Sequence, residues 1–131
     1  MTSQWLHDFS LVRDERYQHA IRLFNSQEWY AAHDAFEELW HEAVGEERGL
    51  FQGIIQIAVA EHHLGNGNVR GSLLLMAEGL SHLQSIPAQD LGFNLQLLRA
   101  IAGQRLAGLQ TGLEMDDLPL PVLEPKAPNK D

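Results

Sequence analysis

A histidine and a glutamate share the apolar face of an expected helix over residues 25–44. Because successive residues of a helix are rotated by about 100°, one face collects six side chains: Trp29, His33, Phe36, Glu37, Trp40 and Val44. An imidazole or carboxylate buried without a partner costs on the order of 1–3 kcal/mol. We therefore expect His33 and Glu37 to be hydrogen-bonded, ion-paired or bound to a ligand.

A metal site is one chemistry that these residues suit. His33, Glu37 and His62 would supply nitrogen and oxygen ligands for Zn, Mn or Fe, with water completing the shell. This hypothesis predicts a divalent metal cofactor and a metal-dependent enzyme with its site in the core of the protein.

Two better-defined metal motifs are incomplete in this chain. Glu38 and His41 have the Glu-x-x-His spacing of half a di-iron site, but Glu78 and His82 are one residue too far apart to be the second half. The zinc-protease pattern His-Glu-x-x-His is absent. These observations remove the most specific metal enzymes from consideration.

Acid/base chemistry is a second interpretation, because a glutamate in an apolar pocket has a raised pKa and His33 would be its partner. The sequence shows no nucleophile, glycine-rich loop or phosphate cradle beside the pair. No class of reaction follows from it.

We favour a third interpretation, in which the polar side chains fix the packing of helices. His33 and Glu37 would then lie within hydrogen-bond reach of Gln52, Gln56 or His62 on the next helix. The expected buried polar cluster comprises His33, Glu37, Glu38, Trp40, Gln52, Gln56 and His62. This predicts a non-enzymatic binding or scaffold protein without a required cofactor, whose partner is a protein or a small ligand.

Five stretches of helical periodicity position these residues, at about 5–24, 25–44, 46–64, 69–86 and 94–111. The third stretch is apolar nearly all round, which is typical of the central helix of a bundle. Gly53 within it indicates a close helix crossing, and Asn68 is a suitable N-cap for the fourth stretch. Asn25 and Ser26 offer caps for the second, which should end near Gly45.

The predicted fold is all-α, a single-domain bundle of about five helices arranged as antiparallel hairpins around the central apolar helix. The bundle domain should span residues 1–115. Residues 116–131 contain four prolines and should form an extended tail.

Composition excludes several classes of protein. The 131 residues include no cysteine and carry a net charge of −9, which argues against disulfides, nucleic-acid binding and anionic membrane surfaces. No apolar run approaches the roughly 20 residues of a membrane span, so we expect a cytoplasmic protein. The exposed aromatic surface expected of Trp5, Trp29 and Tyr30 predicts a homodimer.

Three segments of the chain resemble a known family. They are H-D-A-F-E-E-L-W from His33, F-Q-G-I-I-Q-I-A-V-A-E-H-H from Phe51, and G-N-V-R-G from Gly67. Together they resemble the all-helical domain of unknown function 309, which implies a small helical bundle without an established activity. The resemblance places family positions on His33, Glu37, Glu38, Trp40, Gln52, Gly53, His62, Asn68 and Gly71. Asp34 stands where family members often have glutamate.

Overall fold

The computed structural model describes residues 8–87 and 89–126 of the protein. Six α-helices follow one another along the chain: α1 Asp8–Arg13, α2 Glu15–Asn25, α3 Trp29–Glu42, α4 Glu46–Gly65, α5 Val69–Gln84 and α6 Leu95–Thr111. A 3-10 turn, η2 Met115–Asp117, comes after them. The predicted all-α bundle is confirmed.

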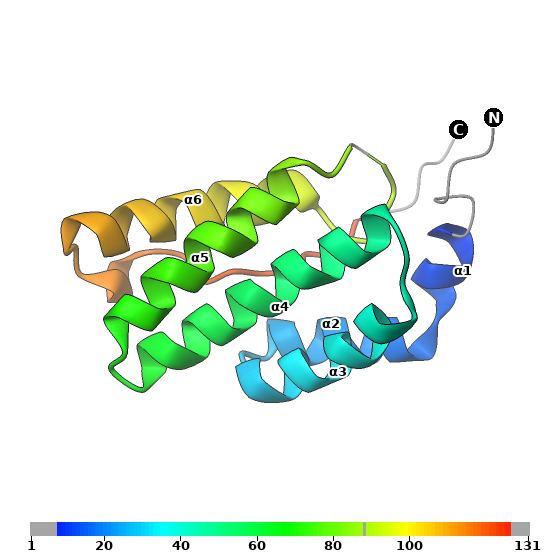
Figure 1. Ribbon diagram of the computed structural model, residues 1–131, viewed down its shortest axis with the longest axis horizontal. Coiled ribbons are helices and arrows are strands. Elements are labelled where there is room, and N and C mark those ends of the chain that lie inside the picture. Colours follow the sequence, from blue (N-terminus) through cyan, green and yellow to red (C-terminus); the bar gives the residue numbers. More distant parts are fainter. Residues whose placement is uncertain (1–7, 88, 127–131) are drawn as a thin grey trace.

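Helix α4 occupies the centre of the bundle, as its apolar sequence predicts. It packs against α3 on one side and α5 on the other, and α5 in turn packs against α6 (Figure 1). The buried apolar side chains of α4 include Leu50, Phe51, Ile54 and Ile57, which are at most 1 % exposed. Burial of an apolar side chain of this size stabilises a fold by about 1.5–3 kcal/mol, so the core depends chiefly on this helix.

The first expected helix, at 5–24, is in fact two helices. The chain leaves helical geometry at Asp14, whose extended backbone (φ −67°, ψ 123°) lets its carboxylate accept a hydrogen bond from the backbone N–H of Arg16. Arg16 also binds Glu42 at the end of α3, and its hydrogen bonds lower the pKa values of Asp14 and Glu42. A cap and an ion-pair network therefore replace the expected continuous helix.

The boundary between α2 and α3 also differs from the prediction. Glu28, not Asn25 or Ser26, occupies the N-cap position of α3, and its side chain makes no capping hydrogen bond. Helix α3 ends at Glu42, so Val44 lies outside it and is 70 % exposed. Val44 is therefore absent from the apolar face to which periodicity assigned it.

Helices α4 and α5 approach closely where two glycines face each other. A Cβ atom on Gly53 would lie 3.0 Å from the carbonyl oxygen of Gly79, and a Cβ on Gly79 would lie 2.9 Å from that of Gly53. Side chains at either position would collide with backbone that cannot move aside without separating the helices. The close crossing predicted from Gly53 is confirmed, as is the cap of α5, where Asn68 accepts a hydrogen bond from Gly71 N–H at 2.9 Å.

The C-terminal segment is extended but packs on the bundle. Residues 118–126, here called the strap, run back along the bundle from the end of α6 towards the turn that precedes it (Figure 1). Leu123 in the strap is fully buried and belongs to the hydrophobic core. None of the described helices combines the length and apolar character needed to span a bilayer.

The glycine crossing yields a stability prediction. Gly79→Ala should destabilise the protein by about 1–3 kcal/mol, because the new methyl group overpacks a backbone contact. The matched control is Gly103→Ala in α6, where an added Cβ meets nothing within 4 Å; it should stabilise by about 0.5–1 kcal/mol. Urea denaturation measures both, and equal effects would show that α4 and α5 have room to separate.

Candidate functional site

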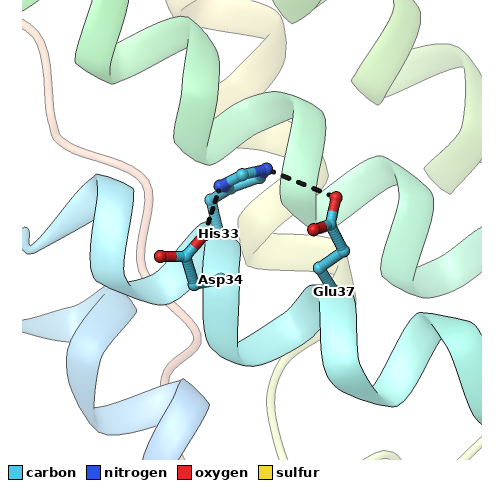
Figure 2. Close-up of side chains that lie close together, drawn as sticks. All are labelled: His33, Asp34 and Glu37. Carbon is cyan, nitrogen blue, oxygen red and sulfur yellow. Dashed lines mark ion pairs between the residues drawn. The ribbon is translucent and has the colours of Figure 1, made fainter.

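His33 lies between two carboxylates of its own helix, α3. Its Nε2 atom is 3.6 Å from Glu37 Oε2, and its Nδ1 atom is 3.2 Å from Asp34 Oδ1 (Figure 2). The contact with Asp34 lacks the geometry of a hydrogen bond, which leaves the enclosed Nδ1 atom without a hydrogen-bond partner. One ligand atom from each of the three residues falls within 4.8 Å of the others.

This group is more exposed than its sequence pattern predicts. The side chain of Glu37 is 47 % exposed and that of His33 21 % exposed. The buried residues of α3 are instead Ala32, Phe36 and Leu39. The face of α3 that packs into the core is therefore rotated by one residue, about 100°, from the face expected from periodicity. The expected burial of Glu37 is wrong.

The predicted hydrogen bonds to α4 are also wrong. Among residues 8–87 and 89–126, none of the hydrogen bonds joins His33 or Glu37 to Gln52, Gln56 or His62. Helix α3 instead buries Ala32, Phe36 and Leu39, while the side chains of His33 and Glu37 lie partly exposed and bind neither glutamine.

Tyr30 stands between the two histidines that the metal hypothesis combined. Its ring centroid lies 5.4 Å from that of His33 and 5.3 Å from that of His62. His62 Nε2 in turn lies 3.2 Å from Asn66 Nδ2. Asp34 therefore replaces His62 as the third member of the group around His33.

Trp40 and Arg48 meet at the opposite end of the same surface. The guanidinium carbon of Arg48 on α4 lies 3.9 Å from the centroid of the Trp40 ring on α3, a cation–π contact. We call this surface the α3–α4 face and define it by Tyr30, His33, Asp34, Glu37, Trp40, Arg48 and His62. Gln52 is half-buried on α4, and Glu38 is exposed on α3.

Within residues 8–87 and 89–126, the exposed aromatic surface that suggested a homodimer is smaller than expected. Trp29 packs edge-on against Phe24 at a ring distance of 5.1 Å, and Trp5 lies outside the described residues. Tyr30 remains, at 58 % exposed.

Gln56 joins α4 to α5 through two polar contacts. Its Nε2 donates to Glu78 Oε1 at 3.0 Å, and its Oε1 lies 2.8 Å from His82 Nδ1. Because a carboxylate only accepts hydrogen bonds, the amide orientation is determined and His82 must donate from Nδ1. Glu78 and His82, whose spacing does not fit a di-iron site, thus serve to hold two helices in register.

A buried ion pair joins α4 to α6. Arg105 donates from Nε to Glu61 Oε2 at 2.5 Å and from Nη2 to Glu61 Oε1 at 2.7 Å, and both side chains are 3 % exposed. Burial raises the pKa of Glu61, and the hydrogen bonds from Arg105 oppose that rise. The desolvation of both charges offsets much of their attraction.

This buried pair was not predicted, although the sequence carries a signal for it. Arg105 lies four residues after Ile101 and four before Leu109, at the centre of the apolar stripe of α6. Glu61 follows a run of apolar residues in α4. Arg105 and Glu61 are thus opposite charges, each placed among the apolar residues of its helix. Such a pattern predicts a buried ion pair, because charged side chains are almost never fully buried unless they are paired.

Comparison with known proteins agrees with the sequence motifs. The profile of the domain of unknown function DUF309 matches residues 17–84, which run from within α2 to the end of α5. The chain belongs to the DUF309 family. An uncharacterized protein of Aquifex aeolicus (strain VF5) is 28 % identical over 90 residues, which are 68 % of this chain and 27 % of that protein. The DUF309 chain thus spans about a quarter of the length of this relative.

Glu61 on α4 and Glu37 on α3 should differ sharply in their effect on stability. Glu61→Ala should cost about 3–5 kcal/mol, because it leaves Arg105 buried and unpaired. Glu37→Ala should change the free energy of unfolding by no more than about 0.5 kcal/mol, as for other exposed sites. Chemical denaturation of both variants measures the difference.

The double variant Glu61→Leu with Arg105→Met tests whether the loss of stability comes from leaving Arg105 buried without a partner. It should recover most of the loss seen with Glu61→Ala, since no charge remains buried alone. A double variant as unstable as the single one would show that the pair is stabilising in itself.

Proposed function

We propose that this chain is a non-enzymatic binding module whose contact surface is the α3–α4 face. The supporting observation is that the polar residues fall into two sets, one that joins helices and one that is exposed on a single face. Gln56, Glu61 and Arg105 join helices inside the bundle, whereas His33, Glu37 and His62 lie partly exposed on one face. The inner residues provide a fixed scaffold, and the outer ones remain available to a partner.

The chemistry of the face favours a basic protein segment as the partner. Tyr30 offers an exposed ring, and the carboxylates of Asp34 and Glu37 lie about one and two turns away on the same helix. An aromatic ring beside carboxylates suits a lysine or arginine side chain. The net charge of −9 would attract such a segment from a distance. The cytoplasmic location predicted from composition belongs to the same proposal.

Titration with a basic peptide tests this function. A ten-residue peptide of alternating lysine and glycine should shift the backbone amide signals of Tyr30, His33 and Glu37 in NMR spectra at low salt, and less at high salt. Glu37→Gln should weaken binding by up to about fivefold, the value of one exposed ion pair.

Glu38→Gln is the matched control, because it removes the same charge from the exposed Glu38 side chain of the same helix. It should leave the affinity within about twofold of the wild type. Equal losses for the two variants would show attraction to overall charge, not to the α3–α4 face.

A divalent cation is a second candidate ligand, supported by the grouping of His33, Asp34 and Glu37. An imidazole whose second nitrogen faces a carboxylate is a common arrangement at metal sites. Calorimetry of untagged protein with ZnCl₂ or MnCl₂ should then show binding that His33→Ala abolishes. His62→Ala should retain it, because His62 lies outside the group. Absence of binding to the wild type would eliminate this candidate.

A further inference from the structure

The strap is held to the bundle through its backbone. Asn25 Nδ2 donates to the carbonyl oxygen of Leu123 at 2.9 Å, and Leu123 N–H donates to Asn25 Oδ1 at 2.7 Å. One side-chain amide thus satisfies both polar groups of one peptide residue, as a neighbouring strand would. This arrangement recognises an extended backbone whatever its side chains.

Both ends of the strap are held in the same way. At one end Asn94 N–H donates to the carbonyl oxygen of Glu124 at 2.9 Å, within an antiparallel bridge between Phe93 and Pro125. At the other end Arg105 Nη1 donates to the carbonyl oxygen of Pro119 at 3.0 Å. The bundle therefore presents fixed donors along a channel that an extended chain fills.

Two side chains of the strap are buried, those of Pro121 and Leu123, and Leu123 is the larger apolar anchor. Leu123 is 0 % exposed, whereas Leu120 is 40 % exposed and Glu124 is exposed. Pro119, Pro121 and Pro125 have no backbone N–H, so few donors of the strap need a partner. A buried leucine among prolines is a compact recognition element with little conformational entropy to lose.

The strap does not fill its surroundings. A hollow of about 460 Å³ borders Leu118 and Leu120, and another of about 280 Å³ borders Pro125. Both hollows open to the surface of the protein. The strap is thus held by separate hydrogen bonds and by its buried side chains, with open space beside its two ends.

We infer that this channel is a binding site for extended, leucine- and proline-containing peptides, and that the strap is its intramolecular occupant. A peptide supplied by a partner protein would place its leucine in the Leu123 pocket and its backbone against Asn25, a mode related to strand addition. Gly112, at φ +71° after α6, provides the point from which the strap would leave. This site is separate from the α3–α4 face and does not depend on it.

The strap competes with any external peptide because it is tethered. A tethered segment acts at an effective concentration in the millimolar range, so an external peptide should bind weakly to the intact protein. Leu123→Asp should release the strap, because a carboxylate cannot enter the apolar pocket without a large desolvation cost.

Fluorescence anisotropy tests the inference with a labelled synthetic peptide that has the sequence of residues 117–126. The full-length Leu123→Asp protein should bind this peptide at least about tenfold more tightly than the wild type does. Adding Asn25→Ala to that protein should remove the gain. A peptide with aspartate at its own leucine 123 position should not bind.

Leu74→Asp is the matched control, because Leu74 is a half-exposed leucine on α5, away from the channel. It should bind the peptide as the wild type does. Equal affinities of the Leu123→Asp and wild-type proteins, with helical circular dichroism intact, would overturn the inference. A wild-type dimer that Leu123→Asp dissociates would also overturn it, by assigning the channel to the strap of a second copy.

Hydrogen exchange of the wild-type protein keeps the inference testable if Leu123→Asp does not fold. The amide of Leu123, bound to Asn25, should exchange at least about tenfold faster than that of Ile57 in the centre of α4, since an exchangeable strap must open without global unfolding. Equal protection of the two amides would show that the strap leaves only when the whole protein unfolds.

Discussion

The structure depends on the burial of α4 by its neighbouring helices, because α4 has apolar side chains on nearly every side. A helix of this kind is stable in water only when neighbours surround it. Helix α3 covers one side and α5 another, and the pair of glycines at Gly53 and Gly79 lets α5 approach to backbone contact. The antiparallel arrangement of the hairpins follows, because the short turns 26–28, 43–45 and 66–68 connect α2 to α3, α3 to α4 and α4 to α5.

The polar residues of α4 have different roles, depending on whether they face a neighbouring helix or solvent. Gln56 and Glu61 face neighbouring helices and are paired with His82 and Arg105, so each pair specifies the register of one helix against another. His62 comes one residue after Glu61 and lies on the partly exposed side. A rotation of about 100° thus separates a structural residue from one that a ligand can reach.

Local signals predicted most of the fold but only part of the candidate site. The close contact at Gly53 and the cap at Asn68 are encoded within a few residues, and both were found in this way. The orientation of α3 was wrong by one residue, since periodicity shows which residues share a face but not which of two adjacent faces is buried. Trp29 and Trp40 made the wrong face look apolar, although each is only partly buried. The partners of Asn25 and Glu61 lie far along the chain, where no local pattern indicates them.

The hydrogen bonds between Asn25 and Leu123 join residues 98 positions apart. The hairpins from α2 to α5 pair neighbouring segments, and such local contacts form early and fast. On the ribosome, Asn25 is synthesised seconds before the segment that satisfies its amide, at about 5–20 residues per second. A newly made bundle therefore presents an open channel until synthesis reaches Leu123, and the strap packs into this channel as a late event of folding.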